Sequence, residues 1–292
     1  MPSSAEPAIS SVDSPERRPL VSVCIPVYNT ERFVAAAVAS ALSQTYRELE
    51  IVIVDNASTD TTAHVLAGFT NPRIRVFRND ENIGAAANFN RALSLARGRY
   101  LKVLCADDVL YPSCLEQQVA VFEADARAEI AVVGCGRDII DDRGKRWLRR
   151  RFPGRAGWIE GSAAIGMTVR SGTNIFGEPA AILVRTEAAR AAGAFDPHYG
   201  FCLDLDLWCR LLRTGGLYMI DETLCGFRVW SQSWSASLAQ GQHREFGRFV
   251  EDLRGRGVPL SAFDRGSGRV RAWVNAFLRQ GVTRMLLLSS RA

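Results

Sequence analysis

The sequence predicts an α/β fold in which helices flank a mostly parallel central sheet, with a helical extension at the C-terminal end. Three observations lead to this prediction. Short apolar runs alternate with segments of helical periodicity up to about residue 104. Acidic residues follow two of these runs, and apolar residues return at helical spacing beyond about residue 240. Strands that alternate with helices are typical of βαβ units, whose strands run parallel.

The first half of the chain carries the clearest elements. Apolar runs predict strands over residues 20–25, 49–54, 74–77 and 100–104. Helical spacing of apolar residues predicts helices over 31–44, 61–67 and 85–96, the last of which ends before Gly98. Ligands of such sheets bind beyond the carboxyl ends of the strands. The polar residues that follow these strands are therefore the first candidates for a site.

The second half is less regular. Strands are expected over 130–136, 180–184 and 217–220, a loop or hairpin over the basic stretch 143–155, and a short helix over 205–212. Residues 1–19 are rich in Ser, Pro, Glu and Arg and are predicted to be a disordered lead-in. We accordingly divide the chain into this lead-in, an α/β domain over 20–238 and a helical extension over 239–292.

Composition places the chain among ordinary globular proteins, with 47% hydrophobic and 23% charged residues. The net charge is +5, and much of it falls within residues 143–155. Such a stretch either meets phosphates, nucleic acid or an anionic membrane surface, or it is simply a solvated loop. The seven cysteines form no C-x-x-C pair and several lie in apolar runs, which indicates free thiols in a reducing compartment. Without a signal sequence or an apolar run of ~18–20 residues, a cytoplasmic protein is expected.

Two acidic segments follow predicted strands. Asp107 and Asp108 come shortly after the strand over 100–104. Adjacent carboxylates suit Mg²⁺ or Mn²⁺, which bind one or two protein carboxylates together with substrate phosphates. The alternative is that Asp108 only caps the next helix. Asp55 follows the strand over 49–54, where it could accept hydrogen bonds from a nucleotide or could merely build an Asx-turn.

Two further acids begin the predicted helix over 205–212. Asp206 and Arg210 are four residues apart and are expected to pair on the helix surface, which makes Asp206 a structural residue. Asp204 lies nearer the helix N-terminus, where a carboxylate is stabilised and stays ionised at neutral pH. An ionised carboxylate that faces a cleft suits a general base. A simple N-cap is the alternative for Asp204.

Other catalytic signatures are missing from the sequence. It contains no G-x-S-x-G, G-x-G-x-x-G or G-x-x-x-x-G-K-[ST] motif. The three histidines, His64, His198 and His243, have no metal-ligand spacing. Hydride transfer and P-loop chemistry are therefore poor candidates.

Together these segments resemble the family 2 glycosyltransferases with a GT-A fold, over roughly residues 20–238. The segments that carry the resemblance are 21–29, 43–46, 54–60 (V-D-N-A-S-T-D), 82–84, 98–100, 106–108, 193–197 and 203–211 (L-D-L-D-L-W-C-R-L). They correspond to the family's first strand and nucleotide-contacting turn, its V-D-D-G-S-T-D and its E-D-x-D-L-W-x-R-L. Each motif alone is modest, but their order and spacing are specific.

The resemblance implies a function and a set of site residues. The reaction would be metal-assisted transfer of a single sugar, with inversion, from a UDP- or dTDP-sugar to a hydroxyl of a glycan or lipid-linked glycan. It implies polysaccharide biosynthesis in the cytoplasm or at the inner face of the membrane and no nucleic-acid partner. Contact with that membrane is expected through the basic stretch 143–155, because aromatic residues are interleaved with its arginines. The implied residues are Asp204 as catalytic base, Asp108 for Mn²⁺ or Mg²⁺, and Pro26, Tyr28, Asn29, Asp55, Gly84 and Asp107 for the nucleotide sugar.

The chain also departs from the family pattern. Asn56 replaces the usual second Asp, Leu203 the usual Glu, and Cys105 the first acid of D-x-D-D. Trp230 stands where many relatives have the His of R-x-H, so no third metal ligand is expected there. The Q-x-x-R-W signature of processive synthases is absent, which favours single-sugar transfer.

Two other functions stay open, the first because of these departures and the second because it uses a similar sheet. The first is a non-catalytic relative that binds nucleotide sugars. The second is a sugar nucleotidyltransferase, which would need a Gly-rich basic loop that residues 26–30 do not supply. For acceptor contacts the candidates are Asn174, Glu178 and His198.

Overall fold

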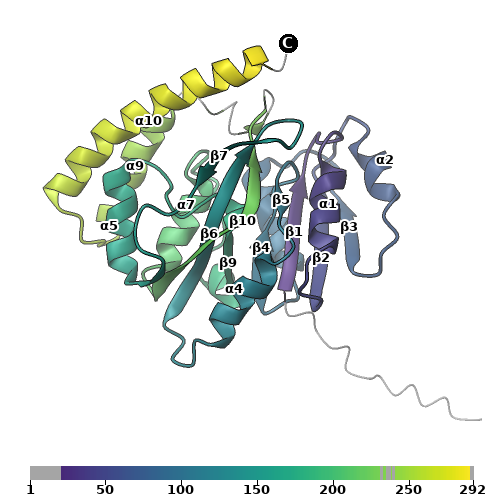
Figure 1. The fold of residues 1–292 in the computed structure, drawn as a ribbon, viewed down its shortest axis with the longest axis horizontal. Helices are drawn as coiled ribbons and strands as arrows, with labels where there is room; N and C mark the ends of the chain where they lie inside the picture. The colour runs from purple at the N-terminus through teal and green to yellow at the C-terminus, as the bar shows by residue number, and fades with distance from the viewer. Residues whose placement is uncertain (1–20, 231–232, 235–237, 239–240, 290–292) are drawn as a thin grey trace, which may run out of the picture.

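The computed structural model describes residues 21–230, 233–234, 238 and 241–289, with the backbone alone for residues 280 and 282–289. The lead-in predicted over 1–19 lies outside the described residues. Within them the chain forms one large sheet covered by helices on both faces (Figure 1).

The first half follows the predicted alternation. Its elements are β1 (Val21–Val27), α1 (Val34–Leu42), β2 (Leu49–Asp55), α2 (Thr62–Ala67), β3 (Ile74–Arg78), α3 (Ala85–Leu95) and β4 (Tyr100–Val103). Every residue of β1 and β2 is buried, which explains their mostly apolar sequences. The polar Ser22 and Glu50 inside them are joined by a hydrogen bond of 2.6 Å. The strands of this half pair in parallel, β1 with both β2 and β4, and β2 with β3.

Two strands of the second half are longer than predicted. Its elements are β5 (Val109–Leu110), α4 (Cys114–Glu123), β6 (Ile130–Ile140), β7 (Arg146–Arg150), β8 (Gly157–Ile159), α5 (Gly161–Ser171), the 3₁₀ turn η1 (Pro179–Ala181), β9 (Ile182–Arg185), α6 (Thr186–Ala191), α7 (Leu203–Leu211) and β10 (Gly216–Arg228). β7 pairs antiparallel with β6, so the hairpin alternative for the basic stretch is confirmed.

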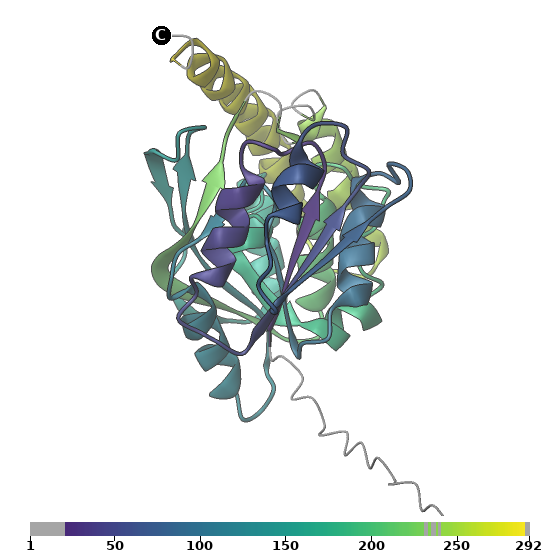
Figure 2. The same ribbon diagram turned by 90° about the vertical axis from the view of Figure 1, so that its right-hand side faces the viewer.

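The sheet order is β3-β2-β1-β4-β9-β6-β10-β5, with β7 beside β6 and β8 beside β10. β3, β2, β1, β4, β6 and β10 run in one direction, whereas β9 and β5 run in the other. Figure 2 views the sheet from its β3 edge and shows the twist of the strands. The α/β fold with a largely parallel sheet is therefore confirmed.

Two apolar clusters cover the two faces of the sheet. One contains Val38 of α1, Leu66 of α2 and Phe122 of α4. The other contains Phe89 of α3 and Trp208 of α7, together with residues of α5, α9 (Gln242–Gly255) and α10 (Ala262–Ser289). The helical C-terminal segment thus shares a core with the α/β domain, and its boundary at residue 238 stays a prediction.

α10 crosses α5 at very close range. A Cβ atom on Gly172, which follows α5, would lie 2.3 Å from the backbone nitrogen of Ala272. A Cβ atom on Gly268 would lie 2.2 Å from the backbone oxygen of Val169. The two backbones are therefore in contact at this crossing, and α10 is anchored there against the domain.

Two features bear on the cellular setting. All seven cysteines are unpaired, and each of them except Cys105 is buried. None of the described helices has the length and apolar character needed to cross a bilayer.

Candidate active site

A cavity of about 850 Å³ opens at the carboxyl ends of β1 and β4 and extends to α7 and α10. Its wall includes most of the site residues predicted from the sequence, namely Pro26, Tyr28, Asn29, Gly84, Asp107 and Asp204. Asp55 and Asp108 do not line it. The carboxyl ends of several strands and the start of α7 therefore surround one cavity.

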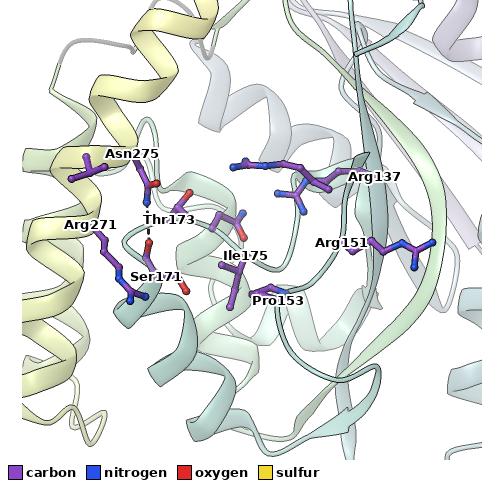
Figure 3. A pocket seen from close by; sticks show the side chains of 11 residues that line it. Arg137, Arg151, Pro153, Ser171, Thr173, Ile175, Arg271 and Asn275 are labelled. Carbon is purple, nitrogen blue, oxygen red and sulfur yellow. Dashed lines mark hydrogen bonds between the residues drawn. The ribbon is translucent and has the colours of Figure 1, made fainter. Parts of the chain in front are cut away.

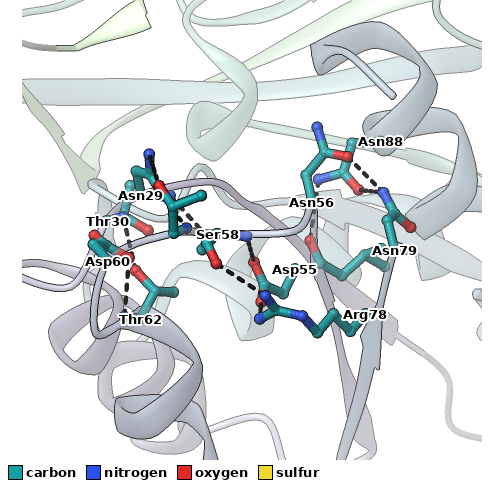
Figure 4. Close-up of polar contacts among 12 residues, drawn as sticks. Asn29, Thr30, Asp55, Asn56, Ser58, Asp60, Thr62, Arg78, Asn79 and Asn88 are labelled. Atoms are coloured by element: carbon teal, nitrogen blue, oxygen red, sulfur yellow. Dashed lines mark hydrogen bonds and ion pairs between the residues drawn. The ribbon is translucent and has the colours of Figure 1, made fainter. Parts of the chain in front are cut away.

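Hydrogen bonds fix the turn after β1 to the turn after β2 (Figure 4). The backbone nitrogen of Asn29 donates to Ser58 Oγ at 3.0 Å, and Asn29 Oδ1 accepts from the backbone nitrogen of Thr59 at 2.8 Å. Asn29 has a positive φ of 50°, a conformation that Asn tolerates better than most residues. These bonds hold the adjacent Tyr28, which is 44% exposed, at the cavity wall.

Asp55 is held by protein groups. It is only 2% exposed, accepts a hydrogen bond from the backbone nitrogen of Ser58 at 3.0 Å and forms an ion pair with Arg78. Arg78 also donates to the backbone oxygen of Ser58 at 2.9 Å (Figure 4). A role for Asp55 at the nucleotide stays a prediction, and Arg78 at the end of β3 is a polar partner that the sequence did not single out.

Asn56 lines the cavity and explains one departure from the family pattern. Its Nδ2 donates to Asn82 Oδ1 at 2.8 Å, while its Oδ1 accepts from the backbone nitrogen of Ile83 at 3.0 Å and from Asn79 Nδ2 at 2.6 Å. An ionised Asp would accept only, so it would lose the bond to Asn82. The amide therefore secures the turn that ends at Gly84, before α3.

Asp107 and Asp108 differ in exposure. Asp107 lines the cavity, and its Oδ2 accepts from Trp230 Nε1 at 2.8 Å. Asp108 is fully buried, and its Oδ1 accepts from the backbone nitrogen of Arg228 at 2.8 Å. Burial raises the pKa of the Asp107 carboxyl, and burial together with the charge of Asp107 raises that of Asp108 well above its usual value.

These two carboxylates fit a divalent cation. Asp108 Oδ2 is buried and has no hydrogen-bond partner among the described residues. A buried carboxylate oxygen without a partner destabilises a folded protein, and a bound cation would satisfy it. The described residues contain no group of three or more His, Cys, Asp or Glu with metal-site geometry. Two carboxylates nevertheless suit Mg²⁺ or Mn²⁺, because these ions complete their shell with phosphates and water.

Trp230 supports Asp107. Besides its hydrogen bond to Asp107, its ring packs edge-on against Phe33 with the centroids 4.9 Å apart. The guanidinium of Arg228 also lies over the Phe33 ring, 4.7 Å from its centroid. Arg228 Nε donates to the backbone oxygen of Asp107 at 2.7 Å. The residue that replaces the family's His therefore orients the carboxylate of Asp107.

Asp204 lies in the first turn of α7 and lines the cavity. Its Oδ2 accepts from Asn174 Nδ2 at 3.1 Å, and its Oδ1 from the backbone nitrogen of Leu205 at 2.7 Å. Burial, and then the charge of Glu178, raise the pKa of Asp204 to about 7. The expectation that the helix start keeps this acid fully ionised at neutral pH is wrong, because burial outweighs the bond from the helix backbone.

Asp206 is also placed differently from the prediction. Its side chain is fully buried, with Arg210 Nε at 2.8 Å from Oδ2 and Arg256 Nη1 at 2.6 Å from Oδ1. The predicted pair with Arg210 exists, but its assignment to the helix surface is wrong. Arg256 follows α9, which packs over this face of α7 and cannot be inferred from spacing within one helix.

Of the acceptor candidates, Asn174 and Glu178 line the cavity and His198 does not. The sequence did not single out Arg279 of α10, which also lines it and donates to Thr173 Oγ1 at 3.4 Å. In the sequence, helix α10 was recognised by the spacing of its apolar residues, and this spacing does not indicate which of its polar residues lie at the cavity.

The sequence matches the family described as Glycosyl transferase family 2 over residues 22–193, more than half of the chain. The chain belongs to this family and is a glycosyltransferase. It is 31% identical over 225 residues to an uncharacterized protein of Mycobacterium tuberculosis, which covers 74% of this chain and 69% of the relative. It is 27% identical over 228 residues to an uncharacterized glycosyltransferase of Rickettsia typhi, which covers 78% of this chain and 70% of the relative.

Solved structures show the same fold. S. aureus TarS 1–349, in complex with UDP-GlcNAc, gives a TM-score of 0.65 at 17% identity and covers 85% of this chain and 69% of that one. The mannosyltransferase PcManGT from Pyrobaculum calidifontis, in complex with GDP-Man and Mn²⁺, gives a TM-score of 0.62 at 18% identity and covers 95% of this chain and 76% of that one. The predicted GT-A architecture is therefore confirmed. The family match ends before α7, so Asp204 lies outside it.

Proposed function

We propose that this chain transfers a single sugar, with inversion and metal assistance, from a nucleoside-diphosphate sugar to an acceptor hydroxyl. The observation that carries the proposal is the shared cavity. Its wall contains Asp107 and the turn after β1 at one end and Asp204 at the other. A donor and an acceptor bound in this space would meet between the two acidic positions.

Asp204 is suited to remove the acceptor proton. With a pKa of about 7 it is partly ionised at neutral pH and can accept the proton as the hydroxyl oxygen attacks the anomeric carbon. The new glycosidic bond forms as the bond to the nucleoside diphosphate breaks on the opposite side. Asn174 holds the carboxylate through Oδ2, and Asn174 Oδ1 is itself fixed by the backbone nitrogens of Phe176 and Gly177 at 3.0 and 3.2 Å.

Asp107 and Asp108 would hold Mn²⁺ or Mg²⁺. A divalent cation bound there neutralises negative charge on the departing diphosphate. PcManGT, a neighbour in fold, was solved with Mn²⁺, which supports metal use without placing an ion in this chain.

The donor is proposed to be a UDP- or dTDP-sugar. TarS was solved with UDP-GlcNAc and PcManGT with GDP-Man, so neighbours in fold accept different nucleotides. Preference for uracil or thymine rests on the resemblance, in which Asp55 accepts from their imide N–H; to do so here, Asp55 would have to exchange its contact with Arg78 for the base. The acceptor is proposed to be a glycan or lipid-linked glycan in polysaccharide biosynthesis.

We place the enzyme in the cytoplasm, with contact to the inner face of the membrane through residues 143–155. The exposed strand β7 supports this contact, because Trp147 and Leu148 are 45% and 53% exposed between arginines. Each basic residue near an anionic leaflet contributes about 1 kcal/mol. Flotation with anionic vesicles at low salt tests the contact, and no enrichment there would favour a solvated hairpin.

The function is tested by measuring turnover of UDP-, dTDP- and GDP-sugars with Mn²⁺ and with EDTA. Asp108→Asn should abolish turnover and keep the fold, because Asn retains an oxygen for the Arg228 backbone bond and removes a buried charge. Asp221→Asn is the matched control, since the Asp221 side chain is 74% exposed. Full activity of Asp108→Asn in EDTA would refute the metal role. Nucleotide binding without any turnover would instead indicate the non-catalytic relative.

A further inference from the structure

A second cavity, of about 410 Å³, lies between α5, the β6–β7 hairpin and α10 (Figure 3). We call it the arginine pocket after the residues that dominate its wall, Arg137, Arg150, Arg151 and Arg271. They come from β6, β7, the residue after β7, and α10. Asn275 of α10 closes one side through a hydrogen bond from its Nδ2 to the backbone oxygen of Ser171 at 2.9 Å. Segments far apart in the sequence therefore each contribute an arginine to the wall of this cavity.

The positive charge in this pocket is only partly neutralised. Arg137 is buried and pairs with Glu178, and Arg151 pairs with the exposed Asp221 at 3.6 Å. Within the described part of the chain, no ion pair is formed by Arg150 or Arg271. An excess of positive charge at a concave surface attracts anions.

The neighbouring charges show the same excess. Burial and the charge of Arg137 lower the pKa of Arg150, and burial and the charge of Arg150 lower the pKa of Arg279 to about 10. Both groups stay protonated at neutral pH. Like charges that depress one another's pKa are stabilised when an anion binds between them.

The pocket opens beside the proposed base. Asn174 lines both cavities and donates to Asp204 Oδ2 at 3.1 Å, and Arg150 also lines both. The donor-side residues Tyr28 and Gly84 line the large cavity alone. An anion in the arginine pocket would therefore lie on the acceptor side of Asp204.

We propose that the arginine pocket binds a phosphate group of the acceptor, a monoester or a diester, and so positions the acceptor hydroxyl at Asp204. This inference rests on the proposed function and adds the acceptor's chemical class. Guanidinium groups bind phosphate through paired, charge-assisted hydrogen bonds. Arginines on separate elements can reach different phosphate oxygens at once, whereas a carboxylate offers two oxygens in one plane.

The test is binding of glycerol 3-phosphate and of UDP to the full chain, measured by calorimetry. The variants are Arg150→Gln and Arg271→Gln, each of which removes one guanidinium that has no ion pair. Arg146→Gln is the matched control, because Arg146 is an exposed arginine of the same strand β7 and lines neither cavity. Each pocket variant should weaken glycerol 3-phosphate binding by about tenfold or more and leave UDP affinity unchanged.

A second arm identifies the source of the phosphate. The same proteins are floated with phosphatidylcholine vesicles that carry a polyprenyl phosphate. If the pocket variants alone lose vesicle binding, the phosphate is carried by a lipid. If the wild-type protein binds only glycerol 3-phosphate and the pocket variants lose that binding, the phosphate is soluble. Melting temperatures confirm that the variants fold.

Other results would overturn the inference. If wild-type protein binds neither glycerol 3-phosphate nor the vesicles, the arginine pocket is not a phosphate site. An equal loss of UDP affinity in Arg150→Gln would assign the arginines to the donor diphosphate, and an equal loss in Arg146→Gln would indicate diffuse charge attraction. Phosphate binding in a protein that binds no nucleotide sugar would instead contradict the proposed function and leave the pocket standing.

Discussion

Replacing Asp206 by Asn should destabilise the fold strongly without touching the site. The carboxylate is fully buried and holds Arg210 through Oδ2 and Arg256 through Oδ1. Removing one partner of a buried ion pair costs about 3–5 kcal/mol, because the remaining charges lose their compensation. Since the side chains of Arg210 and Arg256 are 15% and 30% exposed, water offsets part of the loss, and we expect about 3 kcal/mol.

Differential scanning calorimetry measures the effect. At about 2.1 cal/mol/K of unfolding entropy per residue, a loss of about 3 kcal/mol lowers the Tm of a chain of this length by about 5 °C. Glu251→Gln is the matched control. Glu251 pairs with three arginines, Arg269 at 2.6 Å, Arg254 at 3.2 Å and Arg265 at 4.0 Å, but its side chain is 36% exposed. Its loss should cost less than about 1 kcal/mol. If both variants lower the Tm equally, burial of the carboxylate does not determine the loss of stability.

Three further predictions concern the site. Asp204→Asn should lower kcat by about 10²–10⁴ with unchanged donor affinity by calorimetry; a dead Asp206→Asn beside an active Asp204→Asn would reverse the assignment. Wild-type kcat should rise with pH through about 7 as Asp204 ionises. Glu178→Gln should move this rise to lower pH, because it removes a negative charge and leaves Arg137 unpaired. A pH profile that does not move would exclude Glu178 as a cause of the raised pKa. Asp55→Ala should weaken UDP binding, whereas unchanged calorimetric affinity would leave Asp55 as only the partner of Arg78.

The same raised pKa predicts how stability depends on pH. The folded-state pKa of Asp204, about 7, lies above the unfolded value of 3.8, so the folded protein binds the proton more tightly. The contribution of this group is therefore present below pH 3.8 and is lost as the pH rises through about 7. Asp204→Asn should remove this part of the pH dependence of unfolding.

The strands of the first half could be predicted because burial and local pattern agree there. β1 and β2 are buried along their whole length, so their mostly apolar sequences mark them although each contains polar residues. β10 was predicted only over 217–220, because the exposed Asp221 and Glu222 interrupt its apolar pattern while the strand continues to Arg228. Register shifts against β6 occur at this same place. Irregular pairing of this kind depends on the neighbouring strand and leaves no periodic signal.

The acids of the site could be located from the sequence, but their environments could not. The apolar spacing over 205–212 placed Asp204 at the start of a helix, the resemblance made it the candidate base, and the structure brings it to the cavity. Its pKa depends on burial and on Glu178, which belongs to another part of the chain. Likewise the burial of Asp206 depends on Arg256, fifty residues further on. Such effects belong to the tertiary arrangement and not to local spacing.

The close crossing of α5 and α10 makes two remote positions intolerant of change. Any side chain on Gly172 or Gly268 would meet backbone atoms at 2.2–2.3 Å, so α10 would have to move away from the domain. Arg279 of α10 lines the large cavity and Arg271 lines the arginine pocket. In a comprehensive mutational scan, both glycines should therefore score like active-site residues although neither carries a reactive group. Their substitution would dismantle a wall and leave the acids in place.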